Sequence, residues 1–169
     1  MNGHGQFRVD DIENAYLDGL KLSSAQRARA TRAVDAADMR TRIIGCVALL
    51  CGENSGGRMR LKARKRFEDL CAELTECDSN CKGEVLFSLL QIPIGELINS
   101  RAMRDLAYHA LKADRFTVRA NAVLVLERLA GQGDAVALHL IESALEDLNE
   151  KVRGNAVVAL RNIRDNKSD

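Results

Sequence analysis

The sequence predicts an all-α fold, and three observations support this prediction. Aromatic residues make up only 4% of the chain and Trp is absent, whereas half-buried strands favour aromatic and β-branched side chains. A single proline, Pro93, leaves long stretches free of the residue that most strongly breaks helices. Apolar residues recur at helical spacing along much of the chain. With 169 residues and 46% hydrophobic content, the chain can bury a substantial core.

A nine-residue segment occurs twice towards the end of the chain. Residues 118–126 (VRANAVLVL) return as residues 152–160 (VRGNAVVAL), which places the two arginines 34 residues apart. Two weaker copies occupy residues 42–49 and 82–89. A period of about 34 to 40 residues is typical of helical-hairpin repeats that pack on their neighbours. We therefore expect each copy to be the second helix of a hairpin.

Each gap between copies has room for one further helix and shows helical periodicity. The first of these helices is capped by Ser23 or Ser24 and runs to about Ala37. A separate helix is expected over residues 9–20, where it would cover the first hairpin. The expected apolar stripes are Ala25, Ala28, Ala33 and Val34; Ala63, Phe67, Leu70, Cys71 and Leu74; Met103, Leu106, Ala107, Ala110 and Leu111; and Ala137, Ile141, Ala144, Leu145 and Leu148.

The expected connections between hairpins all contain glycine. They lie at residues 52–57, 91–95 and 131–133, where a helix should end and the chain reverse. The second helices are apolar over most of their circumference, as in residues 120–126. Such helices require neighbours on both sides, which a stack of hairpins provides.

These repeats resemble the HEAT repeat family, particularly its short bacterial form, in which a turn aspartate is followed by Val-Arg and an alanine-rich helix. The likeness is specific over residues 113–164, loose over residues 38–112, and absent from the first twenty residues. The matching residues are Asp114 with Val118, Arg119 and Ala122, and Asp147 with Val152, Arg153 and Ala156, with weaker matches at Asp38 and Arg42 and at Asp78 and Lys82.

The resemblance implies a right-handed α-solenoid of about four hairpins plus the N-terminal helix. This would form a single domain over residues 1–169, with repeats at roughly 23–52, 58–91, 95–131 and 133–164. The resemblance also implies a structural ladder, in which turn aspartates pair with helix arginines of adjacent repeats. The expected ladder residues are Asp114, Arg119, Asp147 and Arg153.

HEAT repeats mostly serve as binding surfaces, and a fold alone does not determine chemistry. The iron-dependent hydroxylases of this fold use His-Glu pairs, but His4, His109 and His139 are each followed by another residue type. The DNA glycosylases of the fold rely on aromatic side chains, which are scarce here. Motifs for phosphate binding, serine hydrolases and zinc proteases are absent. We therefore expect no catalytic residues, although a resemblance to bilin lyases leaves an enzyme of that kind as an alternative.

Five cysteines, an odd number, occur in a chain without an export signal, so reduced thiols in the cytoplasm are expected. Cys77 and Cys81 are four residues apart and could share a helix face. No neighbouring His or second cysteine pair completes a tetrahedral site, so neither a metal nor a cofactor is expected. No apolar run is long enough to span a bilayer, and no membrane partner is expected.

Charge is strongly segregated although the net charge is only +1. Residues 21–66 contain twelve Lys or Arg and three acidic residues, whereas residues 67–101 contain seven acidic and two basic residues. This charge could be a solvated outer face, or it could attract a partner of opposite sign. The candidate binding residues are Arg58, Arg60, Lys62, Arg64, Lys65 and Arg66, together with Arg27, Arg29 and Arg32.

The sequence therefore predicts a non-enzymatic protein-interaction module, such as an adaptor, chaperone or inhibitor-like binder. The preferred partner is another protein with an acidic surface. Sequence-independent binding to a nucleic-acid backbone is the alternative, and the scarcity of aromatic residues disfavours recognition of single-stranded bases. The oligomeric state is left open by the sequence.

Overall fold

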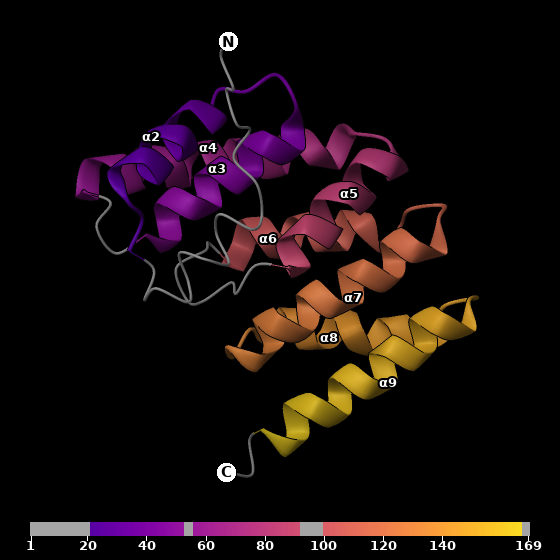
Figure 1. Ribbon diagram of the computed structural model, residues 1–169. Helices are drawn as coiled ribbons and strands as arrows, with labels where there is room; N and C mark the ends of the chain where they lie inside the picture. The colour runs from indigo at the N-terminus through magenta and orange to yellow at the C-terminus, as the bar shows by residue number, and fades with distance from the viewer. Residues whose placement is uncertain (1–20, 53–55, 92–99, 167–169) are drawn as a thin grey trace. The chain divides into compact units, whose positions relative to one another are not determined.

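The computed structural model describes residues 21–52, 56–91 and 100–166, and all regular secondary structure in these ranges is helical (Figure 1). The all-α prediction is therefore confirmed for the described residues. The helix expected over residues 9–20 and most of the connection at residues 91–95 lie outside them. The elements are α2 (Ser24–Ala33), α3 (Met39–Cys51), α4 (Gly57–Glu76), α5 (Ser79–Leu90), α6 (Ser100–Ala110), α7 (Phe116–Gly131), α8 (Ala135–Ser143), the 3-10 helix η1 (Ala144–Glu146) and α9 (Glu150–Asp165).

The chain forms two compact units. Unit 1 comprises residues 1–70 and 91–98, and unit 2 comprises residues 71–90 and 99–169. In its described part, unit 1 contains α2, α3 and most of α4, whereas unit 2 contains the end of α4 and all later helices. Among the described helices, none combines the length and apolar character needed to cross a membrane.

Helix α2 begins as expected but is shorter and buries a different face. Ser23 caps it, with its Oγ accepting from the backbone N–H of Gln26 at 3.2 Å while Gln26 Oε1 accepts from the N–H of Ser23 at 2.8 Å. The helix ends at Ala33 rather than near Ala37. The expected stripe is wrong in its first half, since the first two alanines are exposed. The buried residues are Leu22, Ala30, Ala33 and Val34.

Helix α3 is buried around nearly its whole circumference, and α2 packs closely on it. Asp38 caps α3 by accepting from the N–H of Thr41 at 2.8 Å. A Cβ atom added at Gly45 would lie 2.7 Å from the Cβ of Ala33 and 2.9 Å from the carbonyl oxygen of Ala30. Only glycine therefore permits this approach of the two helices.

In unit 2, α7 lies between α5 and α9, and α6 and α8 also pack against it (Figure 1). This confirms for α7 the prediction that an apolar second helix has neighbours on more than one side. Its buried residues are Val118, Ala120, Ala122, Val123, Val125, Leu126, Leu129 and Ala130.

The apolar stripe predicted for residues 63–74 is buried, as are residues 103, 106, 107 and 110 of the next stripe. The fourth stripe is wrong at its end, because Leu145 is 37% exposed and Leu148 is 98% exposed. Helix α8 ends at Ser143 and a 3-10 turn follows, so these leucines no longer follow α-helical spacing.

The glycine predicted to reverse the chain after α7 does so at Gly133, which has a φ of +94°. Its N–H donates to the carbonyl of Ala130 at 3.0 Å, and the N–H of Asp134 donates to that of Leu129 at 3.1 Å. These two bonds form a Schellman motif, whose left-handed residue favours glycine. Gly52 ends α3 differently, with a φ of −67° that any residue can adopt.

Candidate functional site

The main candidate site is a groove of about 1070 Å³ in unit 1, lined mainly by α4. Its lining is largely apolar, and Leu61 contributes a side chain that is 69% exposed. Met59 contributes from the same helix and Thr31 from α2. A leucine this exposed beside an apolar groove is a feature typical of a binding surface.

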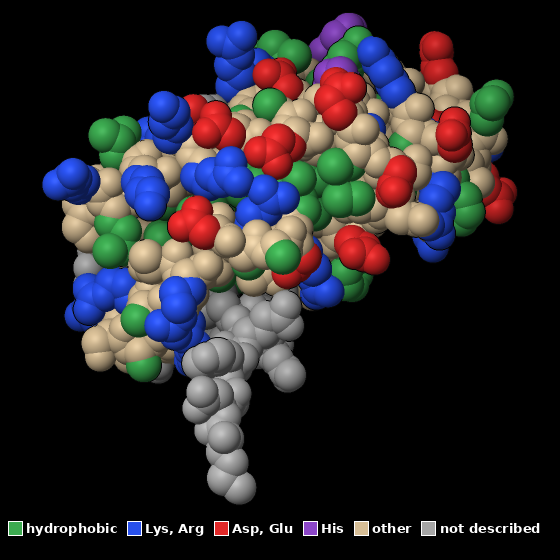
Figure 2. Space-filling model, turned by 90° about the horizontal axis from the view of Figure 1, so that it is seen from above, with side chains coloured by type: hydrophobic (Ala, Val, Ile, Leu, Met, Phe, Trp, Pro, Cys, Tyr) green, Lys and Arg blue, Asp and Glu red, His purple; other side chains and the backbone are tan. Residues whose placement is uncertain are grey.

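Four basic residues also line this groove: Arg58, Lys62, Lys65 and Arg66. The spacing of Arg58, Lys62 and Lys65 along α4 places them on one face of the helix. Asp69 is the one acidic residue among the described residues of the lining. Figure 2 shows Lys and Arg side chains gathered over α2 to α4, at the left of the view, with hydrophobic side chains between them. The groove thus combines an apolar surface with a positive field.

The other five candidate binding residues do not line the groove. Arg60 has a structural role instead, since its Nη2 donates to the carbonyl of Gly52 at 2.7 Å and caps the end of α3. Arg64 is exposed on α4 outside the groove. Helix α2 contributes Thr31 to the lining rather than its arginines, which are Arg27, Arg29 and Arg32.

In unit 2, the structure brings together two of the four expected ladder residues. Arg119 Nε donates to Asp147 Oδ2 at 2.8 Å and its Nη2 donates to Oδ1 at 3.0 Å. The two side chains are only 16% and 13% exposed. Arg119 Nη1 also donates to the carbonyls of Ala113 and Asp114 at 2.8 and 2.9 Å. This two-pronged ion pair joins the turn before α9 to α7.

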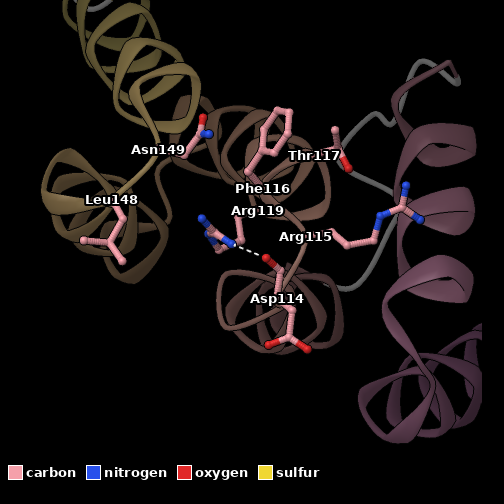
Figure 3. Close-up of a pocket in the computed structure, with 7 residues that line it drawn as sticks. All are labelled: Asp114, Arg115, Phe116, Thr117, Arg119, Leu148 and Asn149. Carbon is pink, nitrogen blue, oxygen red and sulfur yellow. Dashed lines mark hydrogen bonds between the residues drawn. The ribbon is translucent and has the colours of Figure 1, made fainter.

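The Asp114 carboxylate takes no part in the Arg119 ion pair, and its expected pairing with an adjacent repeat stays a prediction. Figure 3 shows Arg119 directed at the carbonyl oxygen of Asp114, whose carboxylate points away. The reason is register: Asp147 precedes Arg153 by six residues, and Ala113 holds the corresponding position before Arg119. An aspartate one residue later in the turn points elsewhere. Arg153 Nη1 donates to the carbonyls at the same two positions, six and five residues earlier, at 2.7 and 3.1 Å.

A smaller pocket of about 450 Å³ lies beside this ion pair (Figure 3). Arg119 lines it, but three of its nitrogens already donate to protein acceptors. The Arg119 guanidinium therefore has a structural role, and the pocket is a weaker candidate site than the groove. The remaining lining residues are Asp114, Arg115, Phe116, Thr117, Leu148 and Asn149.

Three of the described cysteines have thiols with raised pKa values. Burial raises the pKa of Cys46 to about 12 and that of Cys51 to about 11. Burial, together with a hydrogen bond to Cys77, raises the pKa of Cys81 to about 11. These three thiols are protonated at neutral pH and are poor nucleophiles. Within the described ranges, no group of three or more His, Cys, Asp or Glu side chains is placed to hold a metal ion.

Sequence reasoning missed two polar contacts that fix unit 2. Arg104 Nη1 lies 2.9 Å from Asp134 Oδ2, and the same aspartate caps α8 by accepting from two backbone N–H groups. Arg128 donates to the carbonyls of Leu89 and Leu90 at the end of α5. The aspartate directly after a chain-reversing glycine is a helix-start signal, but its arginine partner lies thirty residues away.

Replacing Arg119 with alanine is expected to lower the free energy of unfolding by about 1–3 kcal/mol, since it leaves Asp147 without its charge-assisted partner. Arg153→Ala is the matched control, because it removes only bonds to exposed turn carbonyls. We expect its effect to be below about 1 kcal/mol. Urea denaturation measures both values, and equal losses would contradict the structural role of the Arg119 pair.

The same pair predicts a pH dependence. The hydrogen bond from Arg119 holds the pKa of Asp147 below its ordinary value, against the opposing effect of burial. A depressed folded-state pKa stabilises the protein above the unfolded pKa of about 3.9, and this contribution is lost as pH falls through the folded pKa. As pH falls from about 5 to about 2, the free energy of unfolding should therefore decrease less in Asp147→Asn than in the wild type. Urea titrations at several pH values test this, with exposed Glu150→Gln as control.

No protein-family model, curated protein or solved structure matches this chain. Its functional assignment therefore depends on the residues and geometry of the chain itself. Of the features described above, the groove along α4 is the one that combines volume, apolar lining and unbalanced charge.

Proposed function

We propose that this protein is a non-enzymatic interaction module whose groove along α4 binds an acidic, amphipathic helix of another protein. The main support for this proposal is that exposed Leu61 and four cationic side chains line the same groove. An amphipathic helix can place its apolar face in such a groove and its acidic residues against the basic rim. The two parts of the surface thus call for the same kind of ligand.

A protein ligand fits this groove better than a nucleic acid does. Phosphate backbones are bound mainly through charge, and single strands also through aromatic stacking. Among the described residues that line this groove none is aromatic, and the lining is largely apolar. Apolar lining contributes little to a phosphate backbone but contributes directly to the burial of a partner helix.

The proposed scaffold is a right-handed solenoid of HEAT-like hairpins, which would present the groove as part of an extended surface. Support comes from unit 2, where α5, α7 and α9 follow one another with intervening helices packed against α7. An adaptor, chaperone or inhibitor-like role is compatible with this surface, since each of these requires binding without chemistry.

A pull-down with mass spectrometry tests the proposal, using lysate with and without nuclease treatment. We expect acidic proteins to be recovered equally from both, and to be lost with the bait variant Leu61→Asp. Val136→Asp is the matched control, because Val136 is a 52% exposed apolar residue on α8 that does not line the groove. Recovery that requires nucleic acid, or that survives Leu61→Asp unchanged, would contradict the proposal.

A further inference from the structure

A second candidate surface is the outer face of α9 in unit 2. There, Arg153 makes the same backbone hydrogen bonds through Nη1 as Arg119 makes on α7. In both residues Nη1 donates to the carbonyls six and five residues earlier in the chain. In Arg119 the remaining edge, Nε and Nη2, binds the carboxylate of Asp147. Arg153 is exposed, and the same edge of its guanidinium is held in position by the bonds at Nη1. The turn thus presents a preorganised donor pair suited to a carboxylate.

Two hydrogen bonds mark the face of α7 on which α9 packs. Asn155 Nδ2 donates to the carbonyl of Ala120 at 3.4 Å, and Asn162 Nδ2 donates to Glu127 Oε1 at 2.7 Å. The face of α7 that receives a helix therefore includes a small residue and, seven positions later, a polar acceptor. Between them lies Val123, which is completely buried.

The equivalent positions on α9, 34 residues later, form an exposed face. Val157 is 58% exposed, in contrast to its completely buried counterpart on α7. Gly154 replaces the small alanine, and a Cβ atom added there would meet nothing within 4 Å. Arg161 replaces the glutamate, which changes an acceptor into a donor. We call Arg153, Gly154, Val157 and Arg161 the α9 face.

We infer that the α9 face docks a helix of a separate partner protein, and that this helix is preceded by an acidic turn residue whose carboxylate binds Nε and Nη2 of Arg153. The packing of α9 on α7 is the model for this contact. There, the turn before α9 places the Asp147 carboxylate against Nε and Nη2 of Arg119. Charge favours an acidic partner, since α9 carries four basic and two acidic side chains. This surface lies in unit 2 and does not depend on the groove along α4.

A synthetic peptide with the sequence of residues 144–166 is a suitable probe, because it carries Asp147 and the face of α9 that packs on α7. We expect the fluorescently labelled peptide to bind the full chain in an anisotropy titration. Binding should weaken about tenfold with Arg153→Gln in the protein, and equally with Asp147→Asn in the peptide. Lys151→Gln, which removes an equal charge from an exposed position on the same helix, should change the affinity less than about twofold.

A charge swap separates direct pairing from a general structural effect. Arg153→Glu in the protein should abolish binding of the original peptide, and Asp147→Arg in the peptide should restore a substantial part of it. Absence of saturable binding up to about 1 mM peptide would overturn the proposal. So would binding that depends on Arg119 instead of Arg153, because the peptide would then be replacing α9 on α7. If the full chain dimerises and Arg153→Glu abolishes the dimer, the α9 face binds a second copy of this chain. That result would overturn the proposal of a separate partner protein.

Discussion

Replacing Gly45 with alanine is expected to lower the free energy of unfolding by about 1–3 kcal/mol, because the added methyl group overpacks the contact between α2 and α3. The new Cβ would lie 2.7 Å from the Cβ of Ala33 and 2.9 Å from both the carbonyl oxygen of Ala30 and the backbone nitrogen of Val34. None of these atoms can rotate aside, so one helix must shift away from the other.

The matched control is the same substitution in α9, at Gly154. Nothing lies within 4 Å of a Cβ atom added there, and the residue is exposed on a helix. Because alanine forms helices better than glycine, Gly154→Ala should raise the free energy of unfolding by about 0.5–1 kcal/mol. Urea denaturation followed by circular dichroism measures both changes. Stabilisation by both substitutions would show that α2 and α3 are not in close contact at Gly45.

Reversing the charge of Arg58, Lys62 and Lys65 to glutamate is expected to weaken partner binding by about 100-fold or more. These exposed residues lie together on one face of α4 and line the groove, so the substitutions replace attraction with repulsion of an acidic helix. Arg60 is left unchanged because it caps α3. The partner recovered by pull-down is titrated against the wild type and the variant by calorimetry.

The control for this triple variant reverses three exposed cations of unit 2, Arg101, Lys112 and Lys151, which gives the same net charge. We expect it to bind the partner within a few-fold of the wild type. Wild-type affinity should also fall with salt, since the Debye length shrinks from about 10 Å at 0.1 M to about 3 Å at 1 M. Binding that survives the reversal at α4 would place the contact outside the groove, even if the salt dependence were observed.

Helical periodicity predicted much of the fold correctly, because buried stripes leave a direct signature in the sequence. The stripe from Ala63 to Leu74 is buried throughout its apolar positions, and Gly133 reverses the chain as expected. Periodicity failed where the helix type changed. Leu148 fits a 3.6-residue repeat in the sequence, but it follows a 3-10 turn and is 98% exposed.

The candidate site was predicted only in part. Charge clustering selected α4 as a candidate, but it could not separate Lys62, which lines the groove, from Arg60, which caps a neighbouring helix. Helical spacing could have grouped Arg58, Leu61, Lys62 and Lys65 on one face. The groove is also lined by Thr31 of α2, and no local signal in the sequence predicts that a residue of α2 shares a groove with α4. The sequence likewise contains no sign that Arg119 binds the backbone carbonyl of Asp114 instead of its carboxylate.

Photo-crosslinking from position 61 is the most direct test of whether a partner helix occupies the groove along α4. A photoreactive phenylalanine analogue replaces Leu61 in one bait and exposed Val136 in the control bait. Crosslinked peptides from nuclease-treated lysate are then identified by mass spectrometry. We expect crosslinks from position 61 to helical segments of other proteins that combine an apolar stripe with acidic residues, and few from position 136. Equal crosslinking from both positions, or crosslinks from position 61 to basic or non-helical segments, would contradict the proposal.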